Sequence, residues 1–268
     1  MKRVFLDPGH GGSDPGAVGH GLKEKDVVLD IALQIRHILD KEYENVEIQM
    51  SRTTDISKSL RQRTNEANAW GANYFISIHC NAFNGKAKGY EDFIFSGLSD
   101  SSQSTKYRNI MHREIADGIS LQNRGKKKAN FHVLRETSMP AFLSENGFID
   151  NHSDATLMKQ ASWRKKIAQN HVNGIAKALQ LKKRTNGNQK SDSLYKVIAG
   201  SFQSKEKALN RVSFLKTHGI EAFIETITLS GVKWHRVQSG AFSNRKNAEA
   251  HLKRIEKIGI DAFIIVLS

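Results

Sequence analysis

The sequence has one cysteine, few prolines and no long apolar run. The single cysteine, Cys80, excludes an intramolecular disulfide and a zinc site built from several thiolates. With 3 prolines and 20 glycines among 268 residues, the chain is neither collagen-like nor of low complexity. No stretch approaches the roughly 18 consecutive apolar residues that cross a bilayer, so we predict no membrane span. Its 38% apolar and 25% charged residues instead suit a globular protein held together by packing.

The N-terminus lacks the hydrophobic region of a signal peptide. Lys2 and Arg3 precede the apolar run Val4-Phe5-Leu6, which stops after three residues. A signal peptide needs roughly 7 to 15 apolar residues at this place. We therefore predict a protein that is made in the cytoplasm without a signal peptide and that stays there or leaves by lysis or an unconventional route.

Positive charge exceeds negative charge, with a net charge of +14. The excess is concentrated in residues 181–268, which hold 16 of the 41 basic residues but only 7 of the 27 acidic ones. Such a surplus favours a polyanionic partner, and nucleic acid, anionic lipid and an acidic wall polymer all fit it. A solvated basic surface explains the charge equally well, so charge alone does not choose between them.

A change of composition near residue 181 divides the chain. The thirteen residues 181–193 contain one apolar residue, and we predict an exposed linker at 182–193 between domains at 1–181 and 194–268. After the linker the sequence repeats with a period of 40, since residues 198–202 align with 238–242 and residues 218–224 align with 258–264. Each copy has the pattern of a strand, a helix and a strand. Two such copies predict a small α+β domain of the ferredoxin-like kind.

Before the linker, short apolar runs alternate with helical patterns. The predicted strands cover residues 4–6, 46–50, 74–78, 92–95 and 141–143, and the predicted helices cover residues 25–42, 60–70, 106–121 and 162–181. This alternation predicts an α/β domain with a mixed, mostly parallel sheet flanked by helices. In such domains functional side chains lie in the loops that leave the strand ends.

Four ionisable residues lie just beyond those strands or at a helix start: His10, Glu24, His79 and Glu145. Two imidazoles and a carboxylate suit a catalytic zinc ion that keeps its fourth position open for water, and a second carboxylate can then act as the base. On residue type alone, each histidine could equally serve packing or lie on the surface. Their shared placement at strand ends is what favours a metal site.

Four sequence motifs resemble those of the amidase-3 family of N-acetylmuramoyl-L-alanine amidases. They are DPGHGGSDPGA at 7–17, GLKEKD at 21–26, SIHCNA at 77–82 and SENGFI at 144–149, and the resemblance extends over about residues 1 to 180. It implies that His10, Glu24 and His79 hold one Zn²⁺ and that Glu145 is the catalytic carboxylate.

The two 40-residue copies resemble the SPOR (sporulation-related repeat) domain. This second resemblance implies binding to peptidoglycan glycan strands that have lost their stem peptides. The whole arrangement resembles the mother-cell-lysis amidases of spore-forming bacilli.

Other residues near these motifs have weaker claims. Asp7 and Asn81 could accept or donate hydrogen bonds that orient the metal ligands, although Asp7 could equally just shape its turn. Asp14 and Asp26 are nearby carboxylates, but the resemblance favours Glu24 as the ligand. Because side chains alternate along a strand, Cys80 is expected to point away from the site and into the core.

Two further groups could meet the wall. The basic run formed by Arg124 and residues 126–128 could face anionic wall polymers or simply be solvated. In the repeats we expect Phe202 and Phe242 to be core residues. The candidates for glycan binding are Tyr195, Gln203, Trp234, Gln238 and Ser239.

These observations predict a zinc-dependent hydrolase that cuts the amide bond between N-acetylmuramic acid and L-alanine in peptidoglycan. We expect it to be a monomer that acts at the cell wall, to which the SPOR domain targets it. Two alternatives remain, a zinc peptidase that cuts within the stem peptide and a wall-binding protein without catalysis. No recognition motif supports specific nucleic-acid binding.

Overall fold

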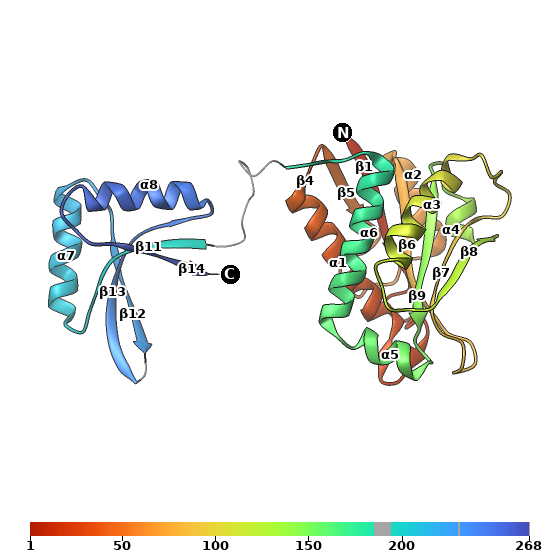
Figure 1. Ribbon diagram of the computed structural model, residues 1–268, viewed down its shortest axis with the longest axis horizontal. Helices are drawn as coiled ribbons and strands as arrows, with labels where there is room; N and C mark the ends of the chain where they lie inside the picture. Colours follow the sequence, from red (N-terminus) through yellow and green to blue (C-terminus); the bar gives the residue numbers. More distant parts are fainter. Residues whose placement is uncertain (185–193, 230, 268) are drawn as a thin grey trace. The chain divides into compact units, whose positions relative to one another are not determined.

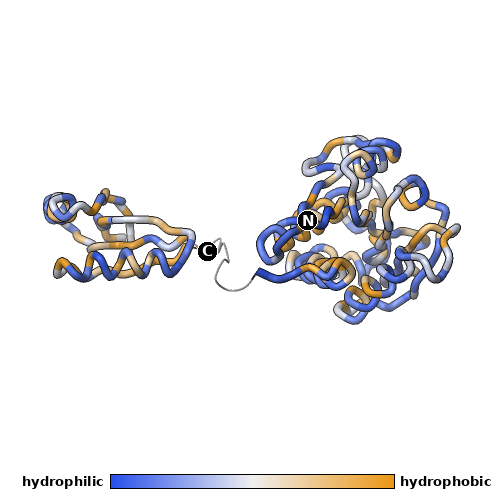
Figure 2. The backbone as a smooth tube through the Cα atoms, turned by 90° about the horizontal axis from the view of Figure 1, so that it is seen from above, coloured by the Kyte–Doolittle hydropathy of each residue, from blue (hydrophilic) through white to orange (hydrophobic). Residues whose placement is uncertain are grey.

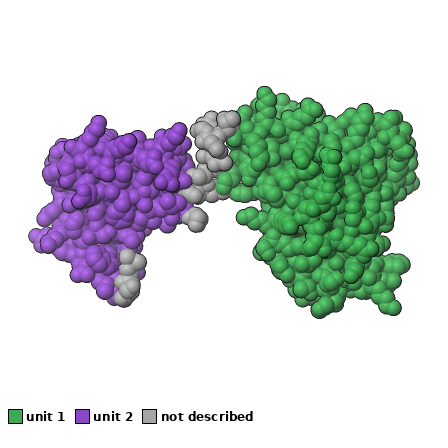
Figure 3. All heavy atoms as spheres, viewed as in Figure 1, with its two compact units in different colours: residues 1–184 green, residues 185–268 purple. Residues whose placement is uncertain are grey.

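The computed structural model describes residues 1–184, 194–229 and 231–267. The chain divides into two compact units, Met1–Arg184 (unit 1) and Thr185–Ser268 (unit 2), which are coloured separately in Figure 3. Lys182 and Lys183, expected in the linker, instead form strand β10, which pairs with strand β4 of unit 1. The rest of the expected linker, residues 185–193, lies outside the described residues.

Unit 1 consists of strands and helices that alternate along the chain (Figure 1). Its strands are β1 (Lys2–Pro8), β2 (Val18–Gly19), β3 (Leu22–Lys23), β4 (Tyr43–Glu44), β5 (Val46–Met50), β6 (Tyr74–Asn81), β7 (Tyr90–Phe95), β8 (Asn123–Ala129), β9 (Ala141–Phe148) and β10 (Lys182–Lys183). Its helices are α1 (Glu24–Glu42), α2 (Leu60–Trp70), α3 (Gln103–Ala116), α4 (His132–Arg135), α5 (His152–Met158) and α6 (Ala161–Leu179).

The main sheet has the order β5-β1-β6-β9-β7-β8. Strands β5, β1, β6 and β9 are parallel, β7 runs antiparallel to β9, and β8 is parallel to β7. The predicted mixed, mostly parallel sheet is therefore confirmed. Strand β8 was not predicted, because its sequence is basic and lacks an apolar run.

Helices cover both faces of this sheet, because side chains alternate along its strands. On β1, Val4 and Leu6 pack with α1 and α6, whereas Phe5 between them packs with α2 and α4 on the other face. The helices alternate between hydrophilic and hydrophobic colours along their turns, as amphipathic helices do (Figure 2). The sheet is thus buried between two helical layers, and only its edges and strand ends remain open.

Unit 2 is a four-stranded antiparallel sheet with two helices. Its elements are β11 (Leu194–Phe202), α7 (Lys205–Thr217), β12 (Phe223–Leu229), β13 (Val232–Phe242), α8 (Arg245–Glu256) and β14 (Phe263–Leu267). The order β12-β13-β11-β14 and the two strand-helix-strand copies confirm the predicted ferredoxin-like arrangement. Ser204 and Asn244, which are 40 positions apart, are the N-caps of α7 and α8, and their side chains accept hydrogen bonds from the backbone amides of Lys207 and Lys246.

Candidate metal centre

His10 lies in a turn whose backbone is held by two buried arginines. It follows strand β1 and has a left-handed backbone, with φ 59°. Arg63 donates to the carbonyl oxygen of His10 at 2.6 Å, and Arg52 donates to that of Gly9 at 2.7 Å. Arg52 and Arg63 are only 2% and 3% exposed. Since buried carbonyl groups need partners, these arginines fix the path of the turn and hence the position of the His10 ring.

Two glycines allow the residues of the site to approach one another. A Cβ at Gly9 would lie 2.2 Å from Cε1 of His79, closer than any packed carbon atom can lie. At Gly16, whose φ is +66°, a Cβ would lie 2.6 Å from Glu24 Oε2. Only a residue without a side chain fits at these two positions.

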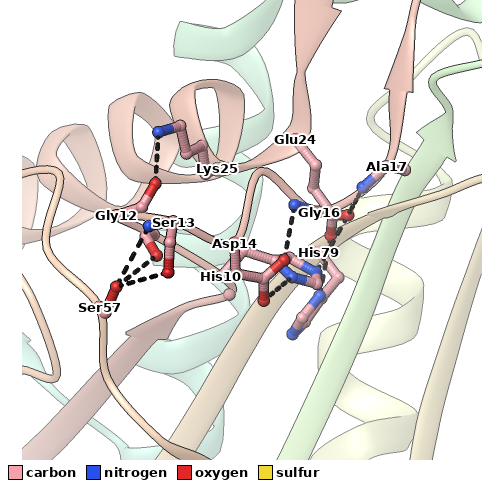
Figure 4. Close-up of polar contacts among 12 residues, drawn as sticks. His10, Gly12, Ser13, Asp14, Gly16, Ala17, Glu24, Lys25, Ser57 and His79 are labelled. Atoms are coloured by element: carbon pink, nitrogen blue, oxygen red, sulfur yellow. Dashed lines mark hydrogen bonds and ion pairs between the residues drawn. The ribbon is translucent and has the colours of Figure 1, made fainter.

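Glu24 stands between the two imidazole rings (Figure 4). It is the first residue of α1, and its Oε2 lies 3.1 Å from Nε2 of His10 while its Oε1 lies 2.8 Å from Nδ1 of His79. The backbone amides of Ala17 and Cys80 also donate to this carboxylate, at 2.9 and 3.0 Å. One ligand atom from each of the three residues lies within 4.8 Å of the others, so the three can share one cation.

The donor set fits zinc. Two imidazole nitrogens and one carboxylate oxygen form the protein ligand set of several catalytic zinc sites, which leave the fourth position open. Burial raises the pKa of Glu24, but hydrogen bonds and charge from His10 and His79 outweigh this and lower it. Burial likewise lowers the pKa of His10, and Glu24 together with Asp14 outweighs it and raises that pKa. A bound cation would replace the protons that these rings share with the carboxylate.

Glu145 lies beside this centre on the adjacent strand. In the register of β6 and β9, Glu145 is the partner of His79. Its Oε2 is buried and has no hydrogen-bond partner among the described residues. Burial raises the pKa of Glu145 well above its usual value, and the charges of Glu24 and Glu91 raise it further. Glu145 and the two histidines line a cleft of about 480 Å³, so a carboxyl group with a raised pKa faces the candidate metal site.

Asp14, rather than Asp7 or Asn81, forms a hydrogen bond with a candidate metal ligand. Its Oδ2 lies 2.8 Å from Nδ1 of His10, the bond expected of a residue that orients a ligand. Asp7 is buried and instead accepts hydrogen bonds from Arg63, Ser51 and Ser77. It reaches His10 only through Arg63, which donates to both.

Asn81 donates to Glu91 Oε1 at 3.0 Å and makes no hydrogen bond to a ligand side chain within the described residues. Cys80 is 2% exposed and lies in the core, as predicted. The burial of Cys80 raises the pKa of its thiol well above the usual value.

A buried histidine behind the site was missed by the sequence analysis. Ser144, next to Glu145, donates its hydroxyl proton to Nε2 of His171 at 2.9 Å, because Nδ1 of that ring faces the carbonyl oxygen of Ile167. His171 is fully buried on α6, and this burial lowers its pKa to about 4. An apolar helix face with one histidine gives no signal of this contact.

The pKa of His171 predicts a loss of stability in acid. Above pH 6.5 the His171 ring is neutral in both the folded and the unfolded protein. As the pH falls below 6.5, the ring becomes protonated in the unfolded protein first. In the folded protein it becomes protonated only near pH 4. The free energy of unfolding should therefore fall by about 1.4 kcal/mol per pH unit in this window, or about 3 kcal/mol in all. His171→Gln should remove that part of the slope.

Hydrogen exchange of the α6 amides measures this effect, since α6 belongs to unit 1 alone. Comparing the unmodified protein with His171→Gln at each pH cancels the intrinsic exchange rates. Between pH 7 and 8 the free energies of unfolding of the two proteins should change with pH in the same way. Equal slopes between pH 6.5 and 4 would contradict the assignment.

The glycan-binding candidates of unit 2 do not form one group. Trp234 and Gln238 lie on the sheet face opposite Val237, which packs against the helices. Tyr195 packs toward the helices, Gln203 is exposed after β11, and Ser239 is buried and donates to a backbone carbonyl. Phe202 and Phe242 pack against the core, as predicted.

Comparison with known families decides the identity of unit 1. The family profile Amidase_3, N-acetylmuramoyl-L-alanine amidase, matches residues 4–177, more than half of the chain. The chain belongs to this amidase family. A second profile, the SPOR domain, matches residues 168–266. Both predicted resemblances are therefore confirmed, and the chain is an N-acetylmuramoyl-L-alanine amidase with a SPOR domain that binds the cell wall.

Individual amidases are similar over most of the chain. N-acetylmuramoyl-L-alanine amidase CwlM of Bacillus licheniformis is 47% identical over 224 residues, which are 84% of this chain and 85% of that protein. The sporulation-specific N-acetylmuramoyl-L-alanine amidase of Bacillus subtilis is 46% identical over 84% of each chain. The catalytic domain of the amidase CwlV from Bacillus (Paenibacillus) polymyxa var. colistinus superposes with a TM-score of 0.64 at 34% identity, covering 68% of this chain and all of that domain. Within the described part of this amidase, no helix is both long and apolar enough to cross a membrane.

Proposed function

We propose that this amidase cuts the bond between the lactyl group of N-acetylmuramic acid and L-alanine with one Zn²⁺ held by His10, Glu24 and His79. The observation that carries the proposal is the convergence of these three ligand atoms within 4.8 Å of one another, beside the carboxyl group of Glu145, whose Oε2 is buried. Membership of the amidase family supports this bond over a bond within the stem peptide. No observation on the described residues specifically favours a peptidase that cuts within the stem peptide or a wall-binding protein without catalysis.

The metal and the protein have separate roles in this proposal. When bound, Zn²⁺ polarises the scissile carbonyl and lowers the pKa of a coordinated water toward about 7. His10 presents Nε2 and His79 presents Nδ1, the two ring atoms that face Glu24. Asp14 holds the His10 ring from its other nitrogen, which fixes the orientation of the ligand.

Glu145 moves the protons. Its carboxylate takes a proton from the attacking water and delivers it to the alanine nitrogen, which leaves as an amine. A carboxyl group with a raised pKa, whose Oε2 has no competing hydrogen bond among the described residues, suits this exchange. The lactyl group keeps the new carboxylate, and the stem peptide leaves with a free N-terminal alanine.

The test is mass spectrometry of purified cell wall after digestion, with and without a chelator. We expect glycan with free lactyl carboxylates and peptides that begin with alanine, no products once a chelator has removed the metal, and recovery when Zn²⁺ is added back. Peptides with other new N-termini would identify a peptidase, and unchanged digestion after metal removal would exclude the zinc mechanism.

For unit 2 we propose binding to glycan strands without stem peptides through the sheet face that carries Trp234 and Gln238. Aromatic rings stack on sugars, and Gln238 Oε1 is a buried acceptor without a partner among the described residues. Residues 1–184 have their own core, so the same digestion can be repeated with unit 1 alone. Soluble fragments should then be cut as before and insoluble wall more slowly. Release at mother-cell lysis is a further part of this proposal, supported by the name of the sporulation-specific relative.

A further inference from the structure

The basic run on strand β8 is divided into two pairs by a bend at Gly125. This glycine has a φ of +87°, and the register between β7 and β8 shifts at the same place, between Tyr90 and Asp92. As a result Arg124 and Lys127 both reach the carboxylate of Glu91, at 2.7 and 2.6 Å.

The other pair of the run points elsewhere. Lys126 Nζ bonds Asn109 on α3, and Lys128 Nζ bonds Asp100. Of the four basic residues of this run, only Arg124 and Lys127 therefore lie toward the face of the sheet that carries Glu91.

Positive charge is in excess around Glu91. This carboxylate is 4% exposed and is shared by two cations, which leaves one formal positive charge. The cations of the cleft beside the metal centre are instead paired one to one, Arg63 with Asp7 and Lys58 with Glu66. An excess positive charge beside a pocket favours the binding of an anion there.

Arg124 has donors to spare. Its Nε bonds Glu91 and its Nη1 bonds the carbonyl oxygen of Lys88, whereas Nη2 has no hydrogen-bond partner among the described residues. The guanidinium lies 4.8 Å from the centre of the Phe148 ring, which holds its plane in place. A guanidinium that is fixed on one edge and open on another can take a carboxylate without losing much side-chain freedom.

The pocket at Arg124 is adjacent to the reacting groups. It has a volume of about 220 Å³, and Asn81, Glu91 and the exposed ring of Phe83 are among its lining residues. Asn81 follows His79 by two positions on β6, and Glu91 is the cross-strand partner of Glu145 on β9. Cross-strand Cβ atoms lie about 4.5 to 5.5 Å apart. An extended peptide advances about 3.3 to 3.6 Å per residue, so its second residue can reach from the scissile bond to this pocket.

We propose that Arg124 is a specificity-determining residue that binds a carboxylate on the second residue of the stem peptide. The inference rests on the proposed amidase function and names the side of the scissile bond on which the peptide lies. A planar guanidinium pairs with a carboxylate through two parallel hydrogen bonds, whereas the corresponding amide lacks the charge and offers only one acceptor oxygen. Arg124 therefore makes the enzyme prefer the free acid, and Glu91 positions the guanidinium.

The experiment compares two soluble muropeptides that differ only in this group, free α-carboxylate against α-amide. We expect the unmodified enzyme to cut the acid with a kcat/KM about 10- to 100-fold higher, as for a charge-assisted hydrogen bond. Arg124→Gln should bring the ratio to about one by slowing cleavage of the acid alone, and Arg124→Lys should keep part of the preference. Lys126→Gln, on the same strand but outside the pocket, should leave the ratio unchanged.

The outcomes separate the inference from the function on which it rests. If the unmodified enzyme cuts neither muropeptide at the lactyl amide, the proposed function fails and the inference fails with it. If both are cut and the ratio is near one, or Arg124→Gln keeps the preference, only the inference is overturned. It is also overturned if Arg124→Gln slows digestion only of walls that carry anionic polymers, since Arg124 would then bind those polymers. Cleavage of the amide at the normal rate serves as the check that Arg124→Gln is folded.

Discussion

Glu145→Gln is expected to lower kcat about 10³-fold while Zn²⁺ stays bound. Glutamine has nearly the shape of glutamate but cannot carry a proton between the water and the alanine nitrogen, and proton transfer by a placed side chain contributes about 10²- to 10⁴-fold. Glu145 is not part of the group of three that can hold the metal, so metal content should remain at one ion per chain. Turnover of a soluble muropeptide and metal analysis on the same sample measure the two quantities.

We expect the Glu145→Gln protein to fold normally, so a loss of activity would not be caused by unfolding. Glu145 is half-buried, its Oε2 is buried without a hydrogen-bond partner among the described residues, and its pKa is raised, so the folded protein already disfavours its charged form. A neutral glutamine therefore removes a charge that burial penalises. Glu136→Gln is a matched control, because Glu136 is an exposed carboxylate outside the cleft. Near-full activity of Glu145→Gln with zinc bound would show that another group moves the proton.

The structure brings the predicted candidate ligands together, but the sequence did not predict the residues that hold them in place, and the reason is physical. His79 and Glu145 end apolar runs that are typical of buried strands, and parallel neighbouring strands bring their ends to one edge of the sheet. The turn at His10 is instead held by Arg52 and Arg63, which lie 42 and 53 positions after His10 and donate to the carbonyl oxygens of Gly9 and His10. Arginine side chains are mostly exposed to solvent in folded proteins. The distribution of polar and apolar residues along the sequence therefore gives no indication of two buried guanidinium groups.

Strand β8 is a whole element that the sequence pattern did not predict. A run of lysines has low strand propensity and reads as a loop, but pairing with β7 on the edge of the sheet overrides the local preference. Lys127 and Arg124 are accommodated there because Glu91 pairs with both and offsets part of their charge. Asp14 was noticed for its residue type alone; its role follows from a left-handed turn at His10 that no periodicity predicts.

Glu24→Gln is expected to abolish stable zinc binding and therefore to lower the activity more than about 10³-fold. Glu24 is the one ligand that carries a negative charge, and it lies between the two imidazoles at 3.1 and 2.8 Å. An amide oxygen in its place is neutral, and its NH₂ group would point a donor at one ring or at the metal. Zinc content after dialysis against a weak chelator measures the loss independently of turnover.

Asp14→Asn gives the graded comparison that separates a ligand from its support. Asp14 bonds the non-ligating nitrogen of His10, and loss of such a partner lowers metal affinity about 10- to 100-fold. Zinc in excess should therefore restore the activity of Asp14→Asn but not that of Glu24→Gln. Bound metal also raises the melting temperature in proportion to the logarithm of its concentration. We expect this rise in the unmodified protein, a smaller one in Asp14→Asn and none in Glu24→Gln; a full rise in Glu24→Gln would place the ion elsewhere and remove the basis for the zinc centre.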